Sequence, residues 1–440
     1  MDFIIVYERL NREYQNAVLL KVELERRGYS CLITQYYQAE NFFKTYLGEN
    51  HIILVPNMYI GKNIYRTVSR FGKPKCIVNL QYEQVLSEKW EKLGHHNPRG
   101  DAKYCQHICW GKKTENRLIE SGVPSANVHT LGAIQLDLLR QEFREPRDVL
   151  RNRACKRYGF PVDGKVSLFL SSFTYADITP SRLLMNENAA GVKLDSFVDI
   201  HTKSRCEVVD WLEKYLNDFP DTKLIYRPHP DELSLDIVKD LENRYENFVI
   251  CSEGAAKEWI EISDFVISWY STTVVETHLL DIPYVILRPF TLPQDFDSVL
   301  LKKGMFVKSY SELKKINSEV YSGANVKSLK DQDIFDYYEI SDNKPAYIRY
   351  ADFLVDLKCS HSEFLFDYSL PKLLSARVNT FFVSIVYLLY KIMTTLFGSN
   401  FYKNKKGWFY SWMNEFNNQI RTEDYEIIST EYIKGKFNVR

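Results

Sequence analysis

A histidine between two prolines is the first feature of this sequence that could do chemistry. Arg227 and His229 lie in the run Tyr-Arg-Pro-His-Pro-Asp-Glu at positions 226–232, directly after an apolar segment that we expect to form a β-strand. The prolines stiffen the turn, so both side chains are held at the end of that strand. Arginine and histidine placed in this way can each donate a hydrogen bond to a phosphate. The alternative is an ordinary proline turn with a histidine at the surface.

A second polar set follows another predicted strand, at 265–269. Ser271 and Thr272 open a predicted helix that runs from Ser271 to Leu280. Hydroxyl groups and unpaired backbone amides at a helix N-terminus can hold a phosphate without a glycine loop. Glu276, five residues after Ser271, can then reach a ribose diol. Serine and threonine cap many helices, however, and a glutamate on a helix is commonly solvated, so each residue also has a purely structural explanation.

These residues need a scaffold that brings several strand ends together, and the rest of the chain predicts one. Short apolar segments alternate with helical patterns, then the alternation stops in a charged stretch and restarts. Alternating strands and helices predict a parallel, doubly wound sheet, which binds ligands at the carboxyl ends of its strands. The predicted strands are 3–7, 31–34, 51–55, 75–80, 108–110 and 128–131, then 166–170, 223–226, 248–251, 265–269 and 284–287.

The pattern therefore predicts an α/β protein with two consecutive Rossmann-like domains and a cleft between them that binds the ligand. Ser171 and Ser172 follow the first strand of the second domain and either line the ligand site or form a plain turn. The predicted divisions are an N-terminal domain at 1–140, a linker at 141–160, a C-terminal domain at 161–315 and C-terminal helices at 316–440.

Composition narrows the classes of function. The 440 residues include 57 lysines and arginines and 57 aspartates and glutamates, so the net charge is zero and a nucleic-acid partner is not expected. Eight cysteines are scattered without a CxxC pair, which favours a reducing, cytoplasmic location over a disulfide scaffold. The closest group, Cys105, His107 and Cys109, alternates as a strand does and has no second ligand pair at zinc spacing, so no metal site is expected there.

Together these motifs resemble bacterial surface-polysaccharide transferases with the GT-B fold. That group includes polysialyltransferases, Kdo transferases of capsule synthesis and CDP-glycerol glycerophosphotransferases. The resemblance is specific within 223–290, where the HP and Ser/Thr motifs lie. Over the N-terminal domain it is looser. There it rests on Glu8, Arg12 and Glu13 and on the segments 81–84 and 107–111, which are similar to proteins of surface carbohydrate biosynthesis.

The resemblance implies a nucleotide-activated sugar donor held by the C-terminal domain and a glycan acceptor on the N-terminal domain. A CMP-linked ulosonic acid, such as Kdo or a sialic-acid-like sugar, is the favoured donor. His229 would contact the donor phosphate and stabilise the charge on the leaving nucleotide. Ser271 and Thr272 would hold that phosphate, and Glu276 would bind the ribose. Neither a metal nor a cofactor is expected beyond the nucleotide-linked co-substrate.

The general base remains open, because the chain has no clear pair of acidic residues followed by glycine, the motif that carries the base in the sialyltransferases of this group. A base must lie within about 3 Å of the acceptor hydroxyl, at the end of an N-terminal strand. Glu8 and Glu83 both follow predicted strands, and Glu83 is preferred. His95 and His96 are expected at the surface of a loop.

Two alternatives keep the same fold and the same nucleotide site. One is an enzyme that transfers a polyol phosphate from a CDP donor, or that epimerises a nucleotide sugar. The other is a catalytically silent subunit that binds a nucleotide and recruits a partner enzyme to the membrane.

The C-terminal part carries a local charge bias. Residues 368–414 contain no Asp or Glu but six basic residues, Lys372, Arg377, Lys391, Lys403, Lys405 and Lys406. Within this stretch, 381–397 predicts an amphipathic helix of about 26 Å, shorter than a hydrocarbon core of roughly 30 Å. We therefore expect it to lie in the plane of an anionic membrane, on the inner face of the cell membrane, anchored by Trp408, Phe409 and Trp412. The alternative is a helix packed on the N-terminal domain.

Overall fold

The computed structural model describes most of the chain. The described residues are 1–38, 46, 50–159, 162–232, 234–252, 254–341, 343–360, 366–398, 401, 405, 407–419 and 423–438. They form two compact units. The first unit consists of Met1–Gln84, His96–Phe143 and Tyr338–Arg440, and the second of Val85–His95 and Arg144–Tyr337.

The first unit is built on a parallel sheet. Its described strands follow the order β2-β1-β3-β4-β5-β6. Every residue of β1, β3 and β4 is buried, as expected for parallel strands covered on both faces. The strands are β1 (Phe3–Val6), β2 (Cys31–Thr34), β3 (Ile52–Val55), β4 (Cys76–Asn79), β5 (Gln106–Cys109) and β6 (Val128–Thr130).

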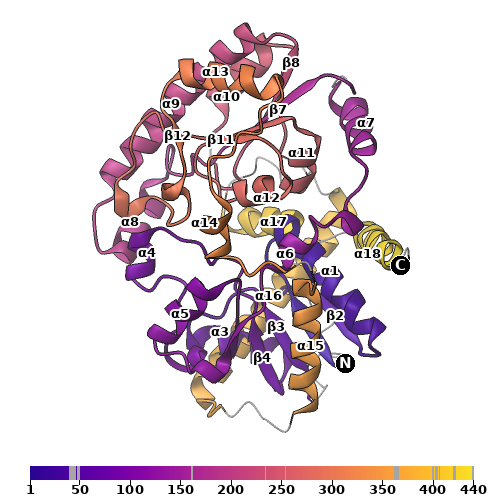
Figure 1. Ribbon diagram of the computed structural model, residues 1–440. Helices are drawn as coiled ribbons and strands as arrows, with labels where there is room; N and C mark the ends of the chain where they lie inside the picture. The colour runs from indigo at the N-terminus through magenta and orange to yellow at the C-terminus, as the bar shows by residue number, and fades with distance from the viewer. Residues whose placement is uncertain are drawn as a thin grey trace. The chain divides into compact units, whose positions relative to one another are not determined.

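Two apolar layers cover this sheet. Alternate residues of a strand point to opposite faces, so Phe3 and Ile5 pack towards one layer and Ile4 and Val6 towards the other. The first layer contains α1, α15 and α18, and the second contains α3 and α16. Helices from the end of the chain, orange and yellow in Figure 1, therefore belong to the same unit as the N-terminal strands, which are indigo. The helices are α1 (Leu10–Arg26), α3 (Gly61–Phe71), α5 (Lys112–Glu120), α6 (Ile134–Asp137), α15 (Ala346–Cys359), α16 (Leu370–Phe397), α17 (Trp408–Gln419) and α18 (Glu423–Asn438).

The second unit repeats this plan with the strand order β12-β11-β10-β7-β8-β9, again all parallel. The strands are β7 (Lys165–Leu170), β8 (Thr222–Arg227), β9 (Phe248–Ile250), β10 (Phe265–Ser268), β11 (Tyr284–Leu287) and β12 (Phe306–Val307). The helices are α4 (Glu88–Lys92), α7 (Arg147–Tyr158), α8 (Pro180–Ala190), α9 (Asp195–Asp218), α10 (Asp236–Arg244), α11 (Ala256–Ile262), α12 (Val274–Leu279), α13 (Tyr310–Tyr321) and α14 (Asp331–Phe335).

The predicted fold class, two doubly wound α/β domains with a helical C-terminal region, is confirmed. The divisions of the chain differ from those predicted. Much of the expected linker at 141–160 is α7, which packs on α11 within the second unit. The expected C-terminal region at 316–440 is divided at Tyr338 between the two units. Lys403 and Lys406 of the basic segment lie outside the described residues.

Candidate functional site

Three loops of the second unit that carry predicted site residues start from neighbouring strands. β7 lies between β8 and β10, and its last residue, Leu170, is paired with Arg227 of β8 and Ser268 of β10. Adjacent strands lie about 4.8 Å apart, so the ends of β8 and β10 are separated by about 10 Å. The residues that follow these strands, Ser171, His229 and Ser271, therefore gather at one carboxyl edge of the sheet, where such folds bind ligands.

The imidazole of His229 is oriented by its own loop. The backbone N–H of Asp231 donates to Nδ1 of His229 at 3.1 Å, and the backbone N–H of Glu232 donates to the His229 carbonyl at 2.9 Å. Because Nδ1 accepts, the proton of the neutral imidazole is assigned to Nε2. In this tautomer Nε2 is the donor nitrogen of the half-buried side chain.

Glu232 anchors the same loop. Its carboxylate accepts hydrogen bonds from the hydroxyls of Ser171 at 2.6 Å and Tyr226 at 2.7 Å, and from the backbone N–H of His229 at 3.4 Å. Burial raises the pKa of Glu232, against these hydrogen bonds and the charge of Arg205. The sequence analysis missed the anchoring role of Tyr226 and Glu232, because the partner Ser171 lies about sixty residues earlier and no local pattern marks the pair.

Arg227 does not join His229. Its guanidinium donates to the carbonyls of Cys251, at 3.4 Å, and Gly254, at 2.6 Å, in the segment after β9. Burial raises the pKa of Glu276 to about 7, although the positive charges of Lys257 and Arg227 oppose the shift. Arg227, Lys257 and Glu276 therefore form one electrostatically coupled group, and Lys257 is a member that the sequence did not single out.

The predicted helix start at Ser271 is wrong. α12 begins at Val274, its N-cap is Thr273, and no side chain makes a capping hydrogen bond there. The Ser271 hydroxyl instead accepts from the backbone N–H of Thr273 at 3.3 Å, a local serine turn that competes with capping. Since α12 has only six residues, contacts with an anion here fall to the half-buried Ser271 and the exposed Thr272 hydroxyls and not to a helix end.

Ser172, the remaining predicted residue of this edge, is buried. Its carbonyl accepts from the backbone N–H of Thr174 at 2.9 Å, which turns the chain after β7. Ser172 therefore lies beside Ser171 at the sheet edge. Its backbone forms part of a turn, which was one of the two possibilities that the sequence left open for this residue.

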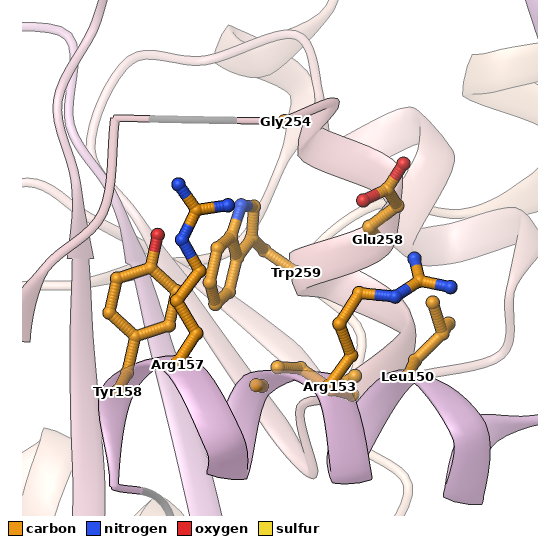
Figure 2. Close-up of a pocket in the computed structure, with 9 residues that line it drawn as sticks. Leu150, Arg153, Arg157, Tyr158, Gly254, Glu258 and Trp259 are labelled. Carbon is orange, nitrogen blue, oxygen red and sulfur yellow. The ribbon is translucent and has the colours of Figure 1, made fainter. Parts of the chain in front are cut away.

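Among the described residues of the second unit, two pockets bear on these loops. The smaller, of about 80 Å³, lies between α7 and α11. Tyr158, Arg157 and Arg153 project from α7, and Glu258 and Trp259 lie on α11 (Figure 2). It has room for a few water molecules and not for a nucleotide. The larger, of about 210 Å³, is lined by Thr174 and Thr272 and so belongs to the carboxyl edge that carries the predicted residues.

The two candidate bases lie in the first unit, after β1 and β4, which flank β3. Glu8 is exposed and accepts from the side-chain amide of Asn57 at 2.9 Å. Glu83 accepts from Arg12 at 2.7 Å and lies 3.4 Å from Nε2 of His96. Each carboxylate thus has a partner from a neighbouring segment, as expected for groups at a common sheet edge.

The environment of Glu83 keeps it charged. Partial desolvation would raise its pKa, but the charge of Arg12 outweighs this effect and holds the pKa of the exposed Glu83 below its usual value. Arg12 also pairs with the fully buried Glu13, which accepts the backbone N–H of Glu8 at 2.6 Å. His96 is not the surface residue expected from the sequence, because it is half-buried and stacks on Tyr59 with ring centroids 4.7 Å apart.

The part of the chain that the structure describes contains no cluster of three or more His, Cys, Asp or Glu side chains arranged to hold a metal ion. In the Cys105, His107 and Cys109 segment, both ring nitrogens of His107 are hydrogen-bonded, to Asn79 at 3.1 Å and to the Ala102 carbonyl at 2.9 Å.

Comparison with known proteins gives structural likeness only. No protein-family model matches the sequence, and no curated protein matches it. The chain is similar to the wall teichoic acid polymerase TagF in a histidine-to-alanine variant, with a TM-score of 0.51 and 14% identity over 81% of this chain and 89% of that chain. A second TagF variant, soaked with CDPG, is similar with a TM-score of 0.51 and 11% identity over 81% of this chain and 88% of that chain. For a UDP-GlcNAc 2-epimerase from Neisseria meningitidis, the TM-score is 0.48 and the identity 11% over 81% of this chain and 100% of that chain.

At these identities the likeness to TagF shows the fold. The chain has the GT-B fold, with two Rossmann-like α/β sheets and additional C-terminal helices, as predicted from the sequence.

Proposed function

We propose that this protein is a glycosyltransferase that moves a sugar from a nucleotide-activated donor to a surface polysaccharide or a lipid-linked glycan. The observation that carries the proposal is the convergence of His229, Ser171 and Ser271 at the ends of three adjacent strands. The carboxylate of Glu232 is engaged by three donors and holds this edge together. An edge of this kind suits an anionic group such as the donor phosphate.

In this proposal His229 donates Nε2–H to the donor phosphate and stabilises the negative charge that develops on the leaving nucleotide. Ser271 and Thr272 donate their hydroxyls to the same phosphate. Because the protein's own donors neutralise this charge, we propose that transfer is independent of metal.

Glu276 accepts hydrogen bonds from the ribose hydroxyls. Arg227 supports it from the neighbouring loop, where its guanidinium is fixed by the carbonyl of Gly254 at 2.6 Å and its charge favours ionised Glu276.

For the general base we retain Glu83, with Glu8 as the second candidate. A base must be ionised before it takes a proton, and the charge of Arg12 favours ionised Glu83. The same charge makes it a weaker base than an ordinary glutamate. Glu8 is exposed and is held by the neutral side chain of Asn57.

The favoured donor is a CMP-linked ulosonic acid, as the sequence resemblance implies. The second candidate function is transfer of a polyol phosphate from a CDP-linked donor. It is supported by the similarity of fold to TagF, a polymerase whose structure was soaked with CDPG. An epimerase and a silent nucleotide-binding subunit remain as outcomes of the test.

The test is a thermal shift of the full chain with CMP, CDP and UDP, followed by mass spectrometry of products from CMP-Kdo, CMP-N-acetylneuraminic acid, CDP-glycerol and UDP-GlcNAc. A ligand at one hundred times its Kd stabilises the native state by about 2.7 kcal/mol, so binding is readily seen. We expect CMP to stabilise most and CMP-linked sugars to be turned over. No shift with any nucleotide would overturn the proposal, and a shift without turnover would favour the silent subunit.

We also propose that the protein attaches to the surface of an anionic membrane through α16. This helix has 28 residues and is therefore about 42 Å long. It begins at Leu370 and not at the predicted residue 381, so the argument that it is too short to span a membrane is wrong. By length and composition α16 could cross a membrane. Its polar side, however, packs on the first unit, where Thr380 hydrogen-bonds to Ser69 of α3 at 2.9 Å and Tyr387 is buried against α17.

The outer side of α16 carries the membrane proposal. Large apolar side chains recur every three or four residues along it and are exposed, which gives one continuous stripe. The stripe consists of Leu370, Leu374, Val378, Phe381, Ile385, Leu388, Ile392 and Leu396. The absence of acidic residues from 368 to 414 suits an anionic lipid surface. A helix held on one side by protein and apolar on the other lies in the membrane plane.

A further inference from the structure

The larger pocket of the second unit has an aromatic wall. Its volume is about 210 Å³, below the range of roughly 300–1,000 Å³ that holds drug-sized ligands, so it fits one ring and not a whole nucleotide sugar. Polar groups are few and include Thr174, Thr272 and His201. The aromatic residues that line it are Trp90, Tyr175, Phe197, Tyr270 and Phe296.

His201 is the unusual member of this wall. It lies in the second turn of α9 and is 1% exposed, and neither ring nitrogen has a hydrogen-bond partner among the described residues. Its neighbours are rings, with the centroids of Phe197 and Trp269 at 4.4 and 4.6 Å. A buried polar group without a partner is destabilising, and an aliphatic or aromatic residue would fill the same space without that penalty. The folded chain alone therefore gives no reason for a histidine here.

The charge state of His201 is defined by its surroundings. Burial and the positive charge of Arg288 lower the pKa of His201 to about 3, so the imidazole is neutral at physiological pH. A neutral imidazole has one donor and one acceptor nitrogen and can pair with a hydroxyl in either direction.

The pocket adjoins the proposed phosphate site. Thr272 lines it, and Thr272 is next to Ser271 in the loop after β10. Thr174 lines it from the loop after β7, three residues beyond Ser171. A group bound in this pocket is therefore next to the atoms that hold the donor phosphate.

We propose that this pocket binds one sugar ring of the substrate, with the aromatic wall against the apolar face of the ring and His201 hydrogen-bonded to one of its hydroxyls. The proposal rests on the proposed function and deepens it, because it names the side chains that select the sugar. Apolar walls with a few placed polar groups are the usual form of such sites. Both nitrogens of His201 are covered in the free chain, so the contact requires a rotation of the imidazole or of a neighbouring ring.

The test compares the full chain with His201→Phe, which keeps a ring and removes both nitrogens. Cys206→Ala is the matched control, since Cys206 lies on the same helix and is exposed. Calorimetry measures binding of CMP, CDP and UDP, of the four nucleotide-linked donors named above, and of methyl glycosides of the same sugars with the nucleotide present. We expect His201→Phe to bind nucleotides as the wild type does, to lose at least tenfold affinity for one sugar-bearing probe, and to melt about 2–4 °C higher.

The two sources of the sugar are distinguished by the probe that responds. A loss confined to the nucleotide-linked probes identifies the donor sugar, and a loss confined to methyl glycosides identifies the acceptor. If His201→Phe does not fold, Thr174→Tyr, which fills the pocket from another wall, must give the same pattern. Unchanged affinity for every probe, or no sugar-dependent binding by the wild type, overturns the pocket proposal. Failure of the wild type to bind any nucleotide overturns the proposed function instead.

Discussion

The hydroxyl of Ser171 donates a hydrogen bond of 2.6 Å to the carboxylate of Glu232, and this contact joins the loop after β7 to the loop that carries His229. Tyr226, buried in β8, donates to the same carboxylate at 2.7 Å. A carboxylate occupied by three donors is poorly placed to remove a proton from a substrate. Glu232 is therefore a positioning residue, which fixes the backbone on which the imidazole of His229 is mounted.

Replacing Glu232 tests this positioning role. Glu232→Ala leaves the buried hydroxyl of Ser171 without its acceptor, while Tyr226 keeps Oγ of Ser171 at 2.8 Å, and we expect a loss of about 1–3 kcal/mol in the free energy of unfolding. The displaced His229 should lower kcat while KM for the acceptor stays unchanged. Glu232→Gln keeps one acceptor oxygen and should recover part of both losses. Urea denaturation and steady-state kinetics measure the effects, with the exposed Glu246→Ala as control; a normal kcat in a destabilised Glu232→Ala would leave only a structural role.

His229→Ala tests the role of the imidazole itself. Removing one preorganised donor to a developing negative charge typically lowers kcat by about 10²–10³. The side chain is only half-buried, so the melting temperature should change little. Transfer assays and circular dichroism provide the two measurements, and Ser234→Ala in the same loop is the control. Unchanged turnover would remove His229 from the mechanism.

The sequence predicted the strands and the sheet edge because buried parallel strands appear as short apolar runs, and the residues after them lie at a common edge. Leu170, Arg227 and Ser268 illustrate this, since each lies within one residue of the end of a predicted strand, and Leu170 pairs in register with both of the others. The side-chain contacts that the sequence could not predict are those between segments far apart in the chain. The pairing of Ser171 with Glu232 is one example.

Two further residues show the same limit. His201 occupies an ordinary helical position, and only the folded chain reveals that its nitrogens have no partner. The start of α12 at Val274 was missed for a local reason, because the Ser271 hydroxyl satisfies the amide of Thr273 and delays the helix by three residues.

The raised pKa of Glu276 leads us to expect that the affinity for nucleotide depends on pH. Its pKa is raised to about 7 by burial, against Lys257 and Arg227. Ribose hydroxyls donate to the ionised carboxylate, so affinity for CMP should rise between pH 6 and pH 8. Glu276→Gln should remove this dependence. Calorimetry at three pH values checks it, and an equal slope in the variant would show that another group titrates.

The same shift has a consequence for stability. The pKa of Glu276 in the folded protein lies above the 4.5 of an unperturbed glutamate, so the folded state holds the proton more tightly. The stabilisation is complete below pH 4.5 and is lost as the pH rises to about 7. Glu276→Gln should therefore melt higher than the wild type at pH 8 and close to it at pH 5. The opposite order would place Glu276 in a more solvated environment.

Glu83 and Glu8 differ in the expected effect of removing the carboxylate. General-base catalysis contributes about 10²–10⁴ in rate, so Glu83→Gln should lower kcat by that factor and Glu8→Gln by less than tenfold. Nucleotide affinity should be unchanged in both variants, since both residues lie in the first unit. The reverse order would assign the base to Glu8. Full activity in both would exclude a carboxylate base at these positions.

The exposed stripe of α16 predicts release from membranes when it is made polar. Phe381 and Leu388 are 69% and 56% exposed, so their replacement by glutamate leaves the core intact. Burying each such side chain in lipid is worth about 1.5–3 kcal/mol, so Phe381→Glu with Leu388→Glu should abolish flotation with anionic liposomes. Met185→Glu, 62% exposed on α8, is the matched control. Because an in-plane helix is held by one apolar face, alkaline carbonate should extract the wild type from membranes, whereas a spanning α16 would resist extraction and would overturn the in-plane arrangement.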